Sequence, residues 1–218
     1  MRGTFKVSYM FLAVMLLALP SARAADRTDR NDLFPRPAAL ESQVRFWRAI
    51  FTDYSERQVV LHDAFDLDKV YAVLDFRPQL EDGMSPGEVD RLQRVTTDLE
   101  LDRLRATLRR LHGARPEDLS ASDLRIYNLW KGDSSPDRFL EAADEKHLRS
   151  QRGLRERFSE GLRLSHRYLP EMERIFHEEG LPVALTRLPL IESCFNVKAY
   201  SKLGAAGVVS FYSGGGMP

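Results

Sequence analysis

Hydrophobic side chains recur along most of this chain at the three- and four-residue spacing of amphipathic helices. The first such segment runs from Ala38 to about Tyr54, and the most regular one runs from Ser85 to Gly113. The latter begins with Ser85-Pro86-Gly87-Glu88, which combines a capping box with a proline in the first turn. The predicted core positions are Leu40, Val44, Trp47, Phe51 and Tyr54 in the first helix, and Val89, Leu92, Val95, Leu99, Leu101, Leu104, Leu108 and Leu111 in the second.

Three more segments have helical spacing, from Ala121 to Trp130, from 137 to 168, and from Pro170 to Gly180. The expected core positions of the last two are Phe139, Leu140, Leu148, Leu154, Phe158 and Leu162, and Met172, Ile175 and Phe176. Residues 77–86 predict a loop. The apolar runs 59–61 and 70–74 are too short for their period to distinguish strands from a helix. The pattern as a whole predicts a mainly α fold.

The N-terminal residues predict export. Arg2 and Lys6 precede an apolar stretch from Val7 to Leu19, and Ala22-Arg23-Ala24 then matches a cleavage site. We therefore expect residues 1–24 to be a signal peptide and the mature chain to be periplasmic or otherwise exported. The alternative is an uncleaved anchor, although the apolar stretch is short for a membrane span. No cysteine lies near the expected cut, which argues against lipid attachment there.

The charge balance narrows the expected partners. The 32 acidic and 32 basic residues cancel, so no overall field favours nucleic acid. The Arg-rich face of the helix from Ser85 to Gly113 could suit an anionic partner, but interleaved acidic residues favour a solvated face. These residues are Asp90, Asp98, Glu100 and Asp102. The one cysteine, Cys194, excludes an internal disulfide and is interpreted as a small buried side chain.

Several short motifs resemble functional sites only superficially. His62-Asp63 could be an acid–base pair, but adjacent side chains point in different directions, so a structural role is favoured. His177-Glu178-Glu179 lacks the second histidine of a metal motif, because position 181 is Leu181. Gly214-Gly215-Gly216 lacks the features of a phosphate loop, and Ser210 and Ser213 lack those of a nucleophile elbow. We therefore expect no metal and no cofactor.

Glu192 is the candidate catalytic residue. On a helix that starts at Pro182, it shares one stripe with the apolar residues Leu181, Leu185 and Leu188, and Pro189 would bend that helix. Aliphatic packing would desolvate the carboxyl group and raise its pKa, as a general acid at neutral pH requires. The alternative is a glutamate at the end of the helix that turns toward water. The residues alone leave both open.

A longer block around Glu192 carries a family resemblance. Gly180-Leu181-Pro182, Leu188-Pro189, Glu192-Ser193-x-Phe195-Asn196, Ala199-x-Ser201 and Gly204-Ala205-Ala206-Gly207 resemble the start of the catalytic domain of lytic transglycosylases of the soluble type. Upstream residues resemble the membrane-bound lytic murein transglycosylase D group. These are Phe46-Trp47, Tyr54, His62-Asp63, Val70-Tyr71, Leu74-Asp75-Phe76, Arg149-x-Gln151-x-Gly153, Phe158-x-x-Gly161 and Tyr168-Leu169.

The resemblance implies a domain arrangement and a reaction. Residues 25–145 would form a helical N-terminal region, and residues 146–218 would begin a goose-type lysozyme-like domain. Glu192 would protonate the glycosidic oxygen of peptidoglycan and then act as a base on the C6 hydroxyl of the muramic acid, leaving a 1,6-anhydro sugar. No second catalytic carboxylate is needed, unlike in most glycoside hydrolases.

The same resemblance assigns Ser193, Ser201, Gly204 and Gly207 to substrate binding. Ser201 would orient Glu192 or the substrate, and the two glycines would let the backbone approach the glycan. Peptidoglycan glycan strands are therefore the expected partner. Peripheral association with a membrane stays open, and the oligomeric state is not addressed.

The chain departs from the family after Gly207. The family continues with a Leu-Trp-Gln-Phe-like segment, where this chain has Val208-Val209-Ser210-Phe211. Phe211, Ser213, Gly214 and Gly216 match again, which favours substitution followed by a truncated, incomplete domain that is inactive by itself. The competing interpretation is a non-enzymatic exported helical module that binds cell-wall glycan or a partner protein. The DNA beyond codon 218 would distinguish the two.

Overall fold

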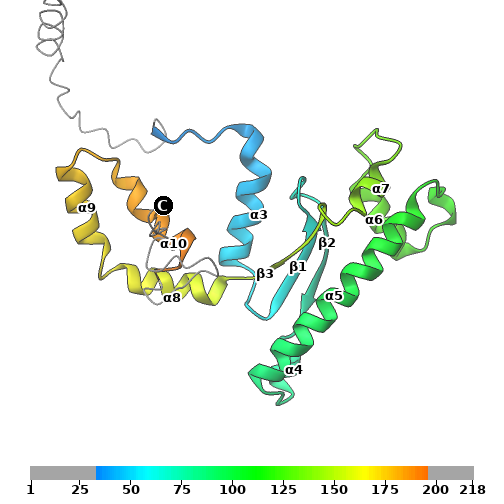
Figure 1. The fold of residues 1–218 in the computed structure, drawn as a ribbon, viewed down its shortest axis with the longest axis horizontal. Helices are drawn as coiled ribbons and strands as arrows, with labels where there is room; N and C mark the ends of the chain where they lie inside the picture. The colour runs from blue at the N-terminus through cyan, green and yellow to red at the C-terminus, as the bar shows by residue number, and fades with distance from the viewer. Residues whose placement is uncertain (1–32, 196–218) are drawn as a thin grey trace, which may run out of the picture.

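A three-stranded antiparallel sheet forms the centre of the protein, between helices on its two faces (Figure 1). The computed structural model describes residues 33–195. The sheet has the order β2-β1-β3, with β1 at Gln58–Asp63, β2 at Val70–Asp75 and β3 at Leu148–Arg152. In the register, Val60 lies opposite Val73 on one side and Gln151 on the other. The two apolar runs 59–61 and 70–74, which periodicity left undecided, are thus parts of strands. The first of them, rich in β-branched valine, lies in the central strand β1 and is buried.

The strand β3 contradicts the prediction of one long helix over residues 137–168. That region contains α7 at Arg138–Ala142, then β3, then α8 at Arg155–Ser165. Of its predicted core positions, Phe139 and Leu148 are buried, whereas Leu140 and Leu162 are exposed. The prediction was wrong because β3 forms by pairing with β1, about 90 residues earlier in the chain, and helical spacing carries no information on such a partner.

The first predicted helix is present, and its predicted core position Phe51 is buried, but the rest of its buried face differs from the prediction. A 3-10 turn, η1 at Ala38–Leu40, leads into α3 at Glu41–Thr52. Its buried residues are Phe46, Ile50 and Phe51. Leu40 and Trp47, which were expected in the core, are exposed. The helix packs Phe46 and Ile50 against Val60 on one face of the sheet.

The other face of the sheet is covered by α5 at Pro86–Leu111, which confirms the most regular helix. The capping box forms as predicted: Ser85 Oγ accepts from the N–H of Glu88, and Glu88 accepts from the N–H of Ser85. Gly113 follows the helix with φ of 75°, a conformation that favours glycine. Val95 and Leu99 are exposed rather than buried. The main core lies between this helix and the sheet and includes Val59, Leu61, Tyr71, Val89, Leu104, Leu108 and Leu111.

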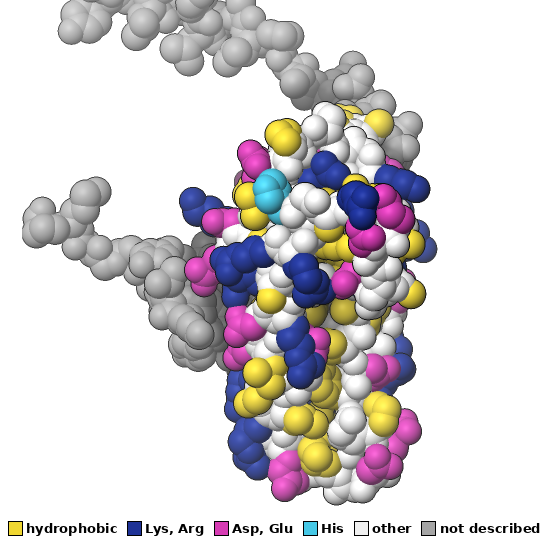
Figure 2. Space-filling view, turned by 90° about the vertical axis from the view of Figure 1, so that its right-hand side faces the viewer, with side chains coloured by type: hydrophobic (Ala, Val, Ile, Leu, Met, Phe, Trp, Pro, Cys, Tyr) yellow, Lys and Arg dark blue, Asp and Glu magenta, His cyan; other side chains and the backbone are white. Residues whose placement is uncertain are grey.

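The outer face of α5 is solvated, as the interleaved charges predicted. Arg103 pairs with Glu100 and Arg105 with Asp102, both one helical turn apart. Figure 2, which views this side of the molecule, shows basic and acidic side chains interspersed with hydrophobic ones. Such exposed pairs contribute little to stability, typically about 0–1 kcal/mol each. One acidic residue, Asp90, instead ties α5 to the sheet, because it accepts from Arg57 and Arg152 at 2.7 Å each.

The remaining elements complete the helical part of the fold. The segment predicted as a loop contains a short helix, α4 at Arg77–Glu81, with Pro78 in its first turn. The turn η2 lies at Pro116–Asp118, and the predicted helix follows it as α6 at Ala121–Leu129. The helix α9 at Leu169–Glu178 is also present, but Met172, Ile175 and Phe176 are not buried as predicted. The chain then continues through η3 at Val183–Arg187 and α10 at Leu188–Glu192.

The expected signal peptide, residues 1–24, lies outside the described residues. Within residues 33–195, no helix is long and apolar enough to cross a membrane.

His62 gives the fold a predicted pH dependence. It is buried in β1 beside the ring of Phe46, and burial lowers the pKa of His62 below its usual 6.5. The contribution of neutral His62 to the free energy of unfolding is therefore complete above the pKa of the unfolded state. It is lost as the pH falls below that pKa, because unfolding then takes up a proton. We expect the free energy of unfolding to decrease from about pH 7.5 to about pH 5.5, by at most about 1.4 kcal/mol per pH unit for this one proton.

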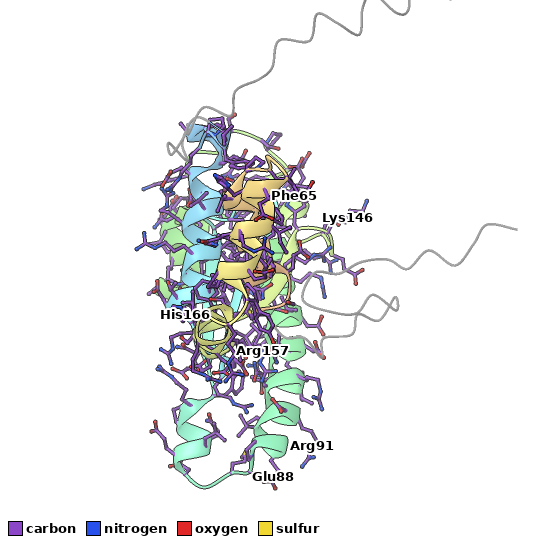
Figure 3. The ribbon with its side chains drawn as sticks, turned by 90° about the vertical axis from the view of Figure 1, so that its left-hand side faces the viewer. Phe65, Glu88, Arg91, Lys146, Arg157 and His166 are labelled. Carbon is purple, nitrogen blue, oxygen red and sulfur yellow. The ribbon has the colours of Figure 1, made fainter. Side chains whose placement is uncertain are left out.

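Urea unfolding across this pH range measures the effect in the wild type and in His62→Gln. The substitution is expected to flatten the dependence, whereas His166→Gln is a control, since His166 is exposed at the end of α8 (Figure 3). Equal slopes for wild type and His62→Gln would contradict this assignment.

Candidate active site

Glu192 is the last residue of α10, and its side chain is exposed. The chain from Pro182 does not form one continuous helix: η3 ends at Arg187, and α10 restarts with Pro189 in its first turn. The break lies where the proline was expected to bend the helix, because Pro189 has no N–H to donate to an earlier carbonyl. Leu181 and Leu188 are exposed as well, so the predicted apolar stripe does not desolvate Glu192 within the described structure. Within the described residues, Glu192 therefore matches the alternative interpretation, a glutamate at the end of a helix that turns toward water.

An unusual backbone turn directly follows Glu192. Cys194 and Phe195 have φ angles of 51° and 53°, in the left-handed region that non-glycine residues rarely adopt. The N–H groups of Ser193 and Phe195 both donate to the carbonyl oxygen of Pro189, at 3.2 and 3.1 Å. Such conformations cost about 1–3 kcal/mol each and persist only where the surroundings enforce them.

Helix α8 supplies those surroundings. A Cβ atom on Gly161 would lie 2.7 Å from the carbonyl oxygen of Cys194, so the turn rests directly on the bare backbone of the helix. The ring of Phe195 is completely buried and stacks on Tyr168, with 6.0 Å between ring centres and an interplanar angle of 15°. Gly161 and Tyr168 are two of the upstream residues that carried the family resemblance. Their contacts fix the backbone that immediately follows the candidate acid.

The other predicted site residues have different outcomes. Ser193 is partly buried, and its hydroxyl donates to the carbonyl of Pro189 at 3.4 Å. Ser201, Gly204 and Gly207 lie outside the described residues. Cys194 is partly buried, and burial raises the pKa of its thiol, which favours the neutral form. That environment suits the predicted role of a small packed side chain better than that of a nucleophile.

The buried carboxylate of Asp63 lies at the far end of β1, next to a partner that sequence reasoning missed. Asp63 is 1% exposed, and its Oδ1 accepts from the N–H groups of Phe65 and Asp66 at 2.8 and 2.9 Å. Its Oδ2 lies 2.9 Å from Nδ1 of His147, just before β3. The neighbour His62 instead donates from Nδ1 to the backbone oxygen of Asp63, which confirms that His62-Asp63 is not an acid–base pair. The true partner is 84 residues away in the chain, and only the β1–β3 pairing reveals it.

Comparisons of the chain with models of protein families, with curated proteins and with solved structures found no match. Among the described residues, no group of three or more His, Cys, Asp or Glu side chains could hold a metal ion.

Proposed function

We propose that this chain carries the catalytic glutamate of a peptidoglycan lytic transglycosylase with a goose-type lysozyme-like catalytic domain. Glu192 would protonate the oxygen of the bond between N-acetylmuramic acid and N-acetylglucosamine and then remove the proton of the C6 hydroxyl. The products would be a 1,6-anhydro sugar end and a free sugar end. Ser193, Ser201, Gly204 and Gly207 would contact the glycan.

The observation that carries the proposal is the backbone around Glu192. An exposed carboxylate precedes two non-glycine residues in left-handed conformations, and that turn rests on Gly161 and stacks on Tyr168. Strained backbone that its surroundings enforce clusters at functional sites, where it orients a side chain. A carboxylate that must meet one oxygen of a long polymer benefits from this fixed placement, because orientation supplies much of the rate enhancement.

The exposure of Glu192 has a consequence for activity. Closing an active site expels water and strengthens the electrostatic interactions inside it. Glu192 would reach such a site once a glycan or another part of the cleft covered it. We therefore expect little turnover from the described residues by themselves, and activity in a form that encloses the site.

Digestion of murein sacculi tests the proposal. Products are separated and weighed, since an anhydro end is lighter by one water than a hydrolysed end. In a form of the protein whose cleft encloses Glu192, we expect anhydro products, and Glu192→Gln should reduce their rate by about 10²-fold or more. Glu179→Gln, at another exposed glutamate, is the matched control.

Two results would overturn this assignment: turnover that survives Glu192→Gln, or release of hydrolysed ends alone. Binding to sacculi without turnover in any form would favour the alternative, a non-enzymatic module.

A further inference from the structure

A second candidate site is a polar cavity of about 510 Å³ between the β1–β2 turn and the loop that follows α6. Its lining residues are Asp66, Lys69, Leu129, Gly132, Asp133 and Ser134. None of them belongs to η3 or α10, so this cavity is separate from Glu192. Its volume is in the range of small-molecule sites, about 300–1,000 Å³.

Lys69 is held as a fixed cation at this cavity. Its side chain is only 13% exposed, its ammonium pairs with Asp66, and it lies 4.2 Å from the centre of the Trp130 ring. Both contacts are attractive for an ammonium group and hold it in place. An ammonium has three N–H donors, and within residues 33–195 only Asp66 accepts one, which leaves donors for an anionic group.

Asp133 supplies the opposite charge. Its Oδ1 accepts from the N–H of Ser135 at 2.8 Å, which fixes the carboxylate in the loop. No Lys, Arg or His of the described chain forms an ion pair with it. The lining therefore contains two carboxylates and one ammonium, and the carboxylate of Asp133 is available to a cation.

Several contacts order the β1–β2 side of the cavity. Buried Asp63 accepts hydrogen bonds from the N–H groups of Phe65 and Asp66, and its other carboxylate oxygen contacts His147. The ring of Phe65 packs on His147 with 4.5 Å between centres, and Figure 3 shows Phe65 and Lys146 at the same end of the molecule. A site whose groups are already ordered loses less entropy when a ligand binds.

We propose that this cavity binds a free α-amino acid, with its ammonium on Asp133 and its carboxylate on Lys69. Asp66 already balances the charge of Lys69, so a simple anion would gain little attraction and would be repelled by Asp133, while a simple cation would leave the remaining N–H donors of Lys69 unused. A zwitterionic α-amino acid carries its ammonium and its carboxylate on the same carbon and can contact both side chains. This binding is independent of the proposed cleavage reaction.

Trp130 provides the readout, because Lys69 lies over its ring. The chain has two tryptophans, so Trp47→Phe leaves Trp130 as the only one. Alanine, alaninamide and N-acetylalanine are titrated while fluorescence is recorded, with calorimetry in parallel. We expect saturable binding of alanine, and binding at least about tenfold weaker for each derivative, since each lacks one charge.

Asp133→Asn is the decisive variant, because an asparagine oxygen can still accept from Ser135 while the charge is lost. We expect it to weaken alanine binding at least about tenfold. Asp144→Asn is the matched control, since Asp144 makes the same kind of contact, to the N–H of Lys146 at 2.8 Å. Glu192→Gln should leave alanine binding unchanged, which separates this proposal from the proposed function.

Absence of saturable alanine binding by both methods, or equal affinity in wild type and Asp133→Asn, would overturn the amino-acid site. If alaninamide bound as tightly as alanine, the role of Lys69 would be wrong.

Discussion

Gly153→Ala is expected to destabilise the whole protein by on the order of 3 kcal/mol, the upper end of overpacking effects. A Cβ atom at this position would lie 2.3 Å from the carbonyl oxygens of both Tyr54 and Ser55. These atoms belong to backbone, so no side-chain rotation can relieve the clash. Gly153 also donates from its N–H to the carbonyl of Gln58 at 3.0 Å, where the chain leaves β3 for α8. Displacing it would separate α3, the sheet and α8 together.

Urea unfolding measures this change as a lower midpoint at an unchanged slope. Natural domains are stable by about 5–15 kcal/mol, so such a loss is a large fraction of the total. Gly87→Ala is the control: it lies in the first turn of α5 with no atom within 4 Å of an added Cβ, and it should stabilise by about 1 kcal/mol or less. A Gly153→Ala protein that unfolds at the wild-type midpoint would contradict the close approach of these strands and helices.

Gly161→Ala is expected to release the turn after Glu192 from α8. The added Cβ would lie 2.7 Å from the oxygen and 2.9 Å from the carbonyl carbon of Cys194. We expect a loss of about 1–3 kcal/mol, although alanine favours helices more than glycine does. The stack of Phe195 on Tyr168 would open, and the left-handed conformations would lose the contacts that enforce them. Any activity that depends on Glu192 should decrease when this turn loses its contacts with α8.

Cys194 reports this local change directly, because it is the only cysteine of the chain. The rate at which a thiol reagent modifies it follows the fraction of molecules in which the turn is open. A local loss of about 1.4 kcal/mol would raise that rate about tenfold. In Gly87→Ala the rate should equal that of wild type. An unchanged Cys194 rate in Gly161→Ala would show that the turn does not rest on α8.

The features that sequence alone predicted are those with local causes. The capping box at Ser85 and Glu88 joins atoms three residues apart, and the left-handed Gly113 after α5 depends only on glycine lacking a Cβ. The break at Pro189 follows from one missing N–H. The mainly helical composition of the fold and the charged outer face of α5 are likewise consequences of spacing along one helix.

The candidate site was only partly predictable for the same reason. The family resemblance singled out Glu192, Gly161 and Tyr168. It did not indicate that Gly161 and Tyr168 contact the turn that follows Glu192. The sequence left open whether Glu192 is buried or exposed, since a helical stripe indicates which residues share a face and not whether anything covers it; in the described structure its side chain is exposed.

The sequence by itself thus determined the most regular helix, its cap at Ser85 and the break at Pro189, and the resemblance singled out Glu192. Only the tertiary structure decided that residues 148–152 form a strand, that Asp63 pairs with His147, and that Gly153 and Gly161 lie against distant backbone. The physical reason is the range of the interactions. Helical hydrogen bonds and caps join residues within about four positions. Strand pairing and close backbone approach instead join residues that are far apart in the chain, and nothing in a local pattern records which partner they will meet.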